Sequence, residues 1–170
     1  MVKNVPVVAV IALGLFLAAA GADRVSADQP ASDTAKISPV DLAKTTPKGK
    51  LANPYRDTQA DIVAQGDALF QRYTCSGCHG PAGGGALCPP VTNEIWVYGG
   101  DDDSLFRLVA LGSAELQSQG YTRIGHESIV APMPPVGVQS SDDLWKILAF
   151  IRAHYAGDPA RKFGAPAAPH

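Results

Sequence analysis

The sequence predicts an all-α protein built around one modest domain. Residues 58–156 hold three stretches in which apolar residues recur with helical periodicity, and no stretch shows the alternation typical of a strand. No internal repeat is visible. A length of 170 residues is enough for one domain of this kind with an extension at each end.

The first helix is predicted to begin after Asp57. Thr58, with Asp61 three residues later, resembles a capping box. A glycine inside a helix costs about 1 kcal/mol relative to alanine, so Gly66 predicts that another helix crosses closely at this point, and the last helix is the expected partner. One buried face is predicted to hold Ile62, Gly66, Leu69, Phe70 and Tyr73.

Two more helices follow. The second is predicted from residues 101–104, three aspartates and a serine, to Gly112, because acidic residues suit the positive end of a helix and glycine often follows the last turn. The third is predicted to begin after Ser140 or Ser141 and to end by Gly157. Its apolar face is predicted to hold Leu144, Trp145, Leu148, Ile151 and Tyr155.

The sequence Cys75-Ser-Gly-Cys78-His79 is the attachment motif of c-type haem. Two cysteines at this spacing reach the two vinyl groups on one edge of a porphyrin and form thioethers. The next side chain then lies under the ring, where the imidazole of His79 can bind iron. The motif therefore predicts one covalent haem c on Cys75 and Cys78, with His79 as an axial ligand.

Other chemistries use the same residue types. A thiol–disulfide centre usually follows a strand in a βαβ unit, which is missing here. A zinc site would need Cys88 or His126 to complete four ligands, and adjacent Cys78 and His79 would strain the backbone by binding one tetrahedral ion. A chance match without a cofactor is the remaining alternative. Haem is the favoured interpretation.

Met133 is the candidate for the second axial ligand. It is the only methionine besides Met1 and follows His79 by 54 residues, enough chain to reach the opposite face of a haem. Prolines on both sides of Met133 restrict the loop. A methionine that only fills the core is the alternative role. His126 is the rival ligand, although a polar or surface role is favoured for it.

The remaining candidates concern the surroundings of the haem. Cys88 is left over once the motif takes two of the three cysteines, and we expect a small, buried and poorly reactive free thiol there. A reactive thiol or an intermolecular disulfide is the alternative. Buried haem propionates need hydrogen-bond donors, and the candidates are Trp96, Tyr98, Tyr121 and Arg123.

The N-terminus has the features of a secretory signal peptide. Lys3 is followed by an apolar run over residues 7–20, and Val25-Ser-Ala27 supplies a cleavage site after Ala27. An earlier site at residues 20–22 and an uncleaved membrane anchor are the alternatives. Cleavage after Ala27 changes the net charge from −2 to −3, which argues against a nucleic-acid partner. Export fits this type of haem attachment and predicts a periplasmic location.

The chain resembles a class I cytochrome c. Gly66-x-x-x-Phe70 before the haem motif, Met133 after it and the aromatic last helix carry this resemblance over about residues 58–156. A closer similarity is to cytochrome c-L and related electron acceptors of pyrroloquinoline-quinone (PQQ) alcohol dehydrogenases, methanol dehydrogenase among them. The segments that carry it are 53–55, 75–80, 96–106, 133–135 and 142–152. Cys88 departs from the pattern.

The resemblance implies three main helices around one covalent haem and a function in single-electron transfer, with no catalysis. The implied partners are a PQQ alcohol dehydrogenase as donor and a downstream cytochrome or terminal oxidase as acceptor. The predicted organisation is a signal peptide (1–27), a disordered linker and N-terminal arm (28–57), the cytochrome c domain (58–156) and a flexible tail (157–170). The alternatives are a haem subunit of a respiratory complex and a haem-based sensor or peroxidase.

Overall fold

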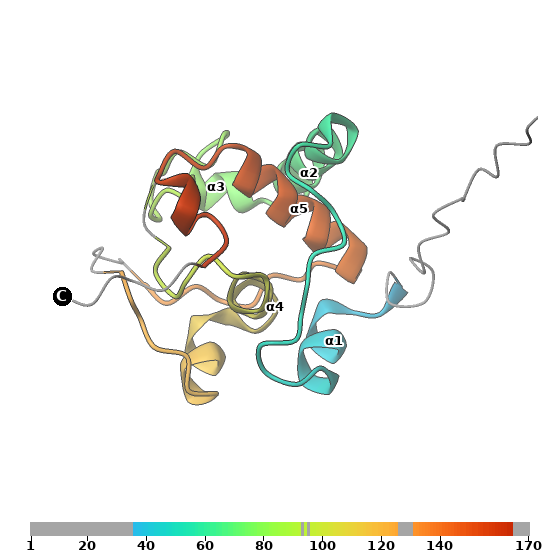
Figure 1. The fold of residues 1–170 in the computed structure, drawn as a ribbon, viewed down its shortest axis with the longest axis vertical. Coiled ribbons are helices and arrows are strands. Elements are labelled where there is room, and N and C mark those ends of the chain that lie inside the picture. Colours follow the sequence, from blue (N-terminus) through green and yellow to red (C-terminus); the bar gives the residue numbers. More distant parts are fainter. Residues whose placement is uncertain (1–35, 93, 95, 126–130, 165–170) are drawn as a thin grey trace, which may run out of the picture.

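The computed structural model describes residues 36–92, 94, 96–125 and 131–164. Within these ranges it contains helices and no strand, which confirms the all-α prediction (Figure 1). None of the helices in the described ranges is long and apolar enough to cross a membrane. The elements are α1 (Pro39–Thr45), α2 (Ala60–Arg72), α3 (Cys75–His79), α4 (Asp102–Ser118), α5 (Ser141–Ala153) and the 3-10 turn η2 (Pro159–Arg161).

The contact between α2 and α5 organises the fold, and Gly66 makes it possible. A Cβ added at Gly66 would lie 2.1 Å from the carbonyl oxygen of Lys146 and 2.8 Å from the Cβ of Phe150. One turn along α2, the ring of Phe70 packs on that of Phe150 with 5.3 Å between centroids. The predicted close crossing at Gly66 is confirmed, and its partner is the last helix.

The helix starts follow the sequence in two cases out of three. Asp101 caps α4 by accepting a hydrogen bond from the amide of Ser104, and Ser140 caps α5 in the same way. The predicted capping box at Thr58 is wrong, because α2 begins one residue later, with Gln59 as its N-cap. The side chain of Gln59 makes no cap bond and instead accepts a hydrogen bond from the amide of Arg56 at 2.6 Å.

Gly112 kinks α4 but does not end it. The sequence predicts the end of a helix here, whereas helical turns resume and continue to Ser118. Gly112 has φ 78° and ψ 164°, a backbone conformation that favours glycine. A Cβ at this position would lie 2.7 Å from the amide nitrogen of Pro135 and 2.9 Å from the carbonyl oxygen of Met133. The kink is therefore the point at which the Met133 loop crosses α4.

The N-terminal arm lies against α4 and α5 (Figure 1). It contains α1, a helix that the sequence analysis does not identify, capped by Ser38. Disorder is predicted from Asp28 to about Ile37, and residues 28–35 of this segment lie outside the described residues. Four apolar residues of the arm reach the core: Leu51 is buried, and Val40, Leu42 and Tyr55 pack against it while partly exposed.

A buried ion pair fixes the arm to α4. The Nε of Arg107 lies 2.9 Å from a carboxylate oxygen of Asp103, and both side chains are only 4% exposed. Arg107 also donates to the carbonyls of Ala43 and Thr46 in the arm. Asp103 accepts from the amide of Leu51 and from the hydroxyl of Tyr121. A buried charge needs such partners, so the pair links three segments.

The electrostatics of Asp103 follow from these contacts. Burial by itself would raise the pKa of Asp103, but hydrogen bonds from Arg107, Tyr121 and the backbone outweigh it and lower the pKa. Burial and the hydrogen bond to Asp103 raise the pKa of Tyr121. The carboxylate is therefore the stable form of Asp103 in the folded chain.

The segment after α5 also packs on the domain. Arg152, buried in α5, pairs with Asp102 and donates to the carbonyl of Gly100 at 2.6 Å. Lys162 forms an ion pair with Asp57, and the guanidinium of Arg152 lies 4.9 Å from the centroid of the Phe163 ring. The sequence predicts a flexible tail over residues 157–170, and within its described part Lys162 and Phe163 contact the rest of the chain.

Candidate functional site

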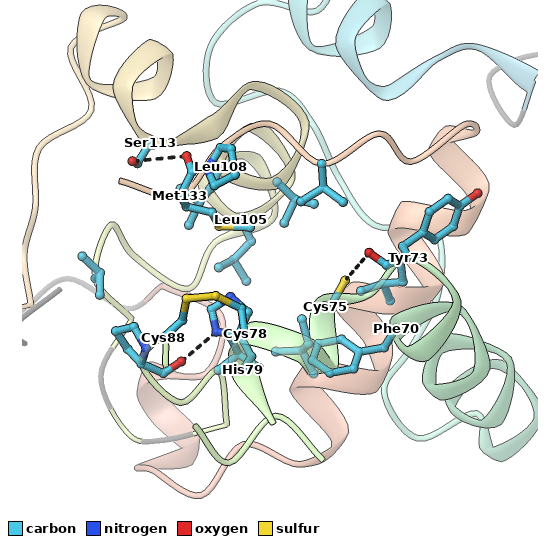
Figure 2. A pocket seen from close by; sticks show the side chains of 18 of the residues that line it. Phe70, Tyr73, Cys75, Cys78, His79, Cys88, Leu105, Leu108, Ser113 and Met133 are labelled. Carbon is cyan, nitrogen blue, oxygen red and sulfur yellow. Dashed lines mark hydrogen bonds between the residues drawn. A yellow bond between two sulfur atoms is a disulfide. The ribbon is translucent and has the colours of Figure 1, made fainter. Parts of the chain in front are cut away.

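A cavity of about 560 Å³ lies beside α3, α4 and α5. This volume is within the usual range of cofactor pockets. Its walls are mostly apolar and come from elements far apart in the sequence, as Figure 2 shows. Side chains of this kind that line it include Phe70, Leu105, Leu108, Val109, Leu148 and Ile151. The three helices predicted from the sequence thus supply its framework.

The motif residues stand at one edge of this cavity. Cys75, Cys78 and His79 all line it from the short helix α3. The residue before the helix, Thr74, has φ 59°, a left-handed conformation that is uncommon for a non-glycine residue. The chain therefore turns sharply between α2 and α3, which brings the motif back under the core. Burial raises the pKa of the Cys75 thiol.

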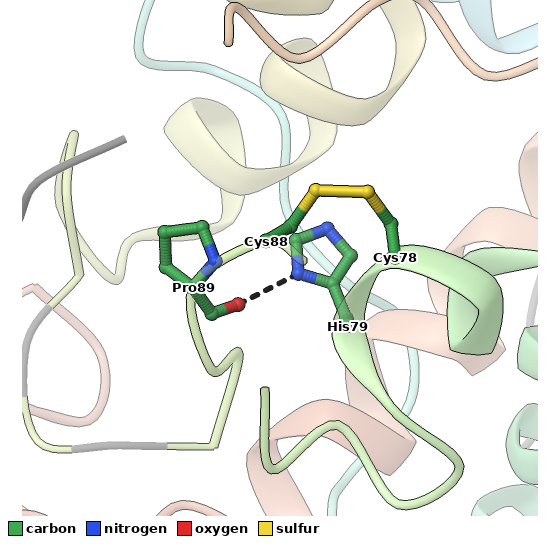
Figure 3. The surroundings of a disulfide bond; sticks show 4 residues. All are labelled: Cys78, His79, Cys88 and Pro89. Carbon is green, nitrogen blue, oxygen red and sulfur yellow. Dashed lines mark hydrogen bonds between the residues drawn. A yellow bond between two sulfur atoms is a disulfide. The ribbon is translucent and has the colours of Figure 1, made fainter. Parts of the chain in front are cut away.

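The His79 imidazole is held in one tautomer. Its Nδ1 lies 2.8 Å from the carbonyl oxygen of Pro89 (Figure 3). A carbonyl oxygen only accepts hydrogen bonds, so Nδ1 carries the proton and Nε2 keeps a free lone pair. Metal-binding histidines are usually oriented by a bond of this type. The role of Pro89 has no signal in the sequence, because its carbonyl reaches His79 only through the path of the loop.

Met133 lies across the cavity from the motif (Figure 2). Its loop is tied to α4 at two points. The amide of Ser113 donates to the carbonyl of Met133 at 2.9 Å, and the amide of Val136 donates to that of Val109 at 3.0 Å. His126, the rival ligand, lies outside the described residues. The structure therefore brings Met133 and His79 to one cavity.

Cys88 is not the free thiol that the sequence predicts. It forms a disulfide with Cys78, and the two Cα atoms lie 5.1 Å apart (Figure 3). Cys75 is the free cysteine. The prediction of an unpaired Cys88 is wrong for the chain in this form, because the glycine- and proline-rich loop after α3 folds back onto the motif. A sulfur in a disulfide cannot form a thioether, so the pairing also bears on the predicted role of Cys78.

Of the four residues predicted as hydrogen-bond donors to the haem propionates, two line the cavity and two do not. Trp96 and Tyr98 line the cavity. The indole Nε1 of Trp96 is buried and has no hydrogen-bond partner among the described residues, whereas the hydroxyl of Tyr98 accepts from Gln117 at 2.8 Å. Tyr121 and Arg123 are not among the described residues that line the cavity, and Tyr121 donates to Asp103 instead. A buried donor without a partner suits a polar edge of a bound group.

The residues present fit a haem, apart from the disulfide. A neutral imidazole nitrogen and a thioether sulfur face one mostly apolar cavity, and these are the axial donors of many c-type cytochromes. Trp96, which lines the cavity, has a buried indole Nε1 without a hydrogen-bond partner among the described residues. Only Cys78 must change its bonding state before the motif can attach the cofactor through both sulfurs.

Comparison with known proteins identifies the family of the chain. The model of the cytochrome c family matches residues 63–154, more than half of the chain. A similar solved structure is cytochrome cL from the marine methylotrophic bacterium Methylophaga aminisulfidivorans, with 23% identity and a TM-score of 0.44 over 62% of this chain and 63% of that one. No curated protein matches. The chain therefore belongs to the cytochrome c family and is an electron carrier with covalent haem c.

Proposed function

We propose that this cytochrome is a periplasmic monohaem carrier that accepts single electrons from a PQQ-dependent alcohol dehydrogenase and passes them to a downstream cytochrome or oxidase. One observation supports the carrier role above all. His79, with a free Nε2, and the thioether-bearing Met133 lie on facing sides of one apolar cavity. Two protein ligands leave the iron no open position for a substrate.

Within this proposal, Cys75 and Cys78 would hold the haem through thioethers, while His79 and Met133 would bind its iron. The bound haem supplies the one-electron chemistry. The protein fixes the orientation of His79 through Pro89 and holds the Met133 loop against Gly112 and Ser113. The apolar wall keeps water from the iron, which favours a high potential with this ligand pair. Acid-acetone extraction tests the attachment, since covalent haem stays with the chain.

The segments that resemble cytochrome c-L contact one another in the fold. The side chain of Asn53 donates to the carbonyl of Trp145 at 3.0 Å, and its amide donates to Asp102 at 2.7 Å. Tyr55 donates to Asp142. These bonds join the arm to the N-termini of α4 and α5. These segments carry the resemblance on which the choice of a PQQ alcohol dehydrogenase as donor rests.

The proposed location depends on the N-terminal segment, which lies outside the described residues. The positive start, the apolar run and Val25-Ser-Ala27 favour export with cleavage after Ala27. Mass spectrometry of the mature chain is expected to give an N-terminus at Asp28. A mature chain that retains residues 1–27 and stays with the membrane fraction contradicts the periplasmic assignment and favours an anchored subunit.

The test of the donor is reduction by a purified enzyme. The oxidised haem-loaded protein is mixed with a PQQ methanol dehydrogenase, and the appearance of the reduced haem spectrum is followed with and without methanol. Rapid reduction that requires methanol is the expected result. Reduction no faster than that of an unrelated c-type cytochrome excludes this donor. Ready binding of carbon monoxide by the reduced protein favours a sensor or peroxidase instead.

A further inference from the structure

The position of Cys88 beside the haem motif is set by backbone contacts. The amide of Cys88 donates to the carbonyl of Cys78 at 2.9 Å, and the amide of Gly85 donates to that of His79 at 2.8 Å. The hydrogen bond from His79 to the carbonyl of Pro89 adds a third tie. These bonds hold the loop 85–89 along α3 without any help from the sulfurs. The Cα separation of 5.1 Å then lies within the normal range for a disulfide.

The disulfide competes directly with the attachment chemistry. Cys78 carries one sulfur, and that sulfur is bonded to Cys88 (Figure 3). A thioether to a haem vinyl needs the same atom. Cys75 is free, so the chain in this form offers one of the two sulfurs that the motif provides. The two cysteines of the disulfide are both half-buried, and Leu87 beside them is 76% exposed, which leaves the bond within reach of a small or protein-borne thiol.

We propose that the Cys78–Cys88 disulfide is the form of the chain before haem attachment, and that a dithiol must reduce it before Cys78 can form its thioether. A thiolate of the reductant attacks one sulfur of the disulfide and forms a mixed disulfide, which the second thiol of the reductant resolves. The S–S bond of the chain gains two electrons and two protons and becomes the thiols of Cys78 and Cys88. The reductant loses the same electrons and protons and becomes a disulfide.

The proposal gives Cys88 a role in loading. While paired with Cys88, Cys78 cannot oxidise with Cys75 inside the motif, and Cys75 stays available. Once Cys78 has formed its thioether, Cys88 remains as a thiol next to Pro89. The proposal rests on the export proposed above, because disulfides persist in oxidising compartments. It does not depend on which dehydrogenase reduces the loaded protein.

The first test maps the cysteines of the haem-free chain. The full chain is produced in cells that make no haem, its free thiols are blocked by alkylation, and its peptides are analysed by mass spectrometry without reduction. The expected result is a linked pair containing Cys78 and Cys88, with Cys75 alkylated. A Cys75–Cys78 link, or alkylation of all three cysteines, overturns the proposal. Cys75→Ser is the matched control, since it is expected to keep the Cys78–Cys88 link.

The second test counts thioethers. The oxidised chain and the same chain treated with a dithiol are each incubated with haem under anaerobic conditions. Peptide mapping and the pyridine haemochrome spectrum then report how many vinyl groups have reacted. The oxidised chain is expected to react through Cys75 alone, and the reduced chain through Cys75 and Cys78. After dithiol treatment, Cys88→Ser is expected to match the reduced wild type. Two thioethers on the untreated oxidised chain, or a Cys78–Cys88 link retained in the haem-loaded protein from the periplasm, overturns the proposal.

Discussion

The imidazole Nδ1 of His79 donates a hydrogen bond to the carbonyl oxygen of Pro89, 2.8 Å away. Pro89 follows Cys88, so one short loop both orients the proposed iron ligand and holds the partner of Cys78. The bond leaves Nε2 as the free donor atom of His79. The orientation of His79 and the pairing of Cys78 therefore depend on the same loop.

Met133→Ala tests the second axial ligand. Loss of the thioether is expected to abolish the weak near-infrared band of an Fe(III)–sulfur bond and to open the reduced iron to carbon monoxide. The potential is expected to fall by on the order of 0.1 V, because a soft sulfur favours Fe(II) and axial ligands span a range of about 0.8 V. Absorption spectroscopy and redox titration measure these changes.

His126→Ala is the control for that variant and is expected to leave all three properties nearly unchanged. If His126→Ala opens the iron while Met133→Ala does not, the ligand pair is bis-histidine. The expected potential then falls, and the case for an alcohol dehydrogenase as donor weakens.

Gly112→Ala tests the support of the Met133 loop. Alanine at φ 78° is strained, and its Cβ would lie 2.7 Å from the nitrogen of Pro135. The free energy of unfolding is expected to fall by roughly 1–3 kcal/mol, and the near-infrared band is expected to weaken as the loop shifts. Gly84→Ala is the control, because a Cβ there meets nothing within 4 Å. Equal effects of the two substitutions would show that the crossing at α4 is not what holds the loop.

Asp103→Asn tests the buried pair that fixes the arm. The folded-state pKa of Asp103 is lowered, so its contribution to stability is present above the unfolded pKa of about 3.9 and is lost as the pH falls below that value. The variant is expected to lose on the order of 3–5 kcal/mol at neutral pH, because Arg107 stays buried without its partner. Below pH 4, the free energy of unfolding of the variant is also expected to fall less steeply with decreasing pH than that of the wild type.

Denaturant unfolding at a series of pH values measures both effects. The control is Asp61→Asn, an exposed position in the first turn of α2, which is expected to follow the wild type closely. If Asp103→Asn keeps the wild-type free energy of unfolding at neutral pH and the wild-type loss of stability below pH 4, the role assigned to the Asp103–Arg107 pair is wrong.

Leu87→Asp tests whether the donor docks at the exposed edge of the cavity beside the haem motif. Leu87 is 76% exposed and precedes Cys88, which lines the cavity. A charge at an apolar contact is expected to lower kcat/KM for reduction by methanol dehydrogenase roughly fivefold, equivalent to about 1 kcal/mol. Ile37→Asp, at an exposed apolar position on the arm, is the matched control and is expected to change little. Identical kinetics for the two variants place the docking surface elsewhere.

Much of the scaffold follows from short-range patterns. The caps at Asp101 and Ser140 depend on residues three positions away. The close helix crossing is predicted by the presence of a glycine at position 66. The cap at Thr58 fails because Gln59 takes the N-cap position while its side chain bonds the preceding turn. Arg107 could have been noticed as a charged residue four positions after Asp103 on a helix, but its partners in the arm could not.

The sequence by itself determined the helical class, the motif at Cys75–His79 and the candidacy of Met133, because each depends on residue type and local spacing. The tertiary structure decided which partners these residues meet. The pairing of Cys88 with Cys78, the bond from His79 to Pro89 and the crossing of the Met133 loop at Gly112 all depend on the path of loops between elements. That path is set by packing of the whole chain, since loop residues lack the periodicity that encodes helices.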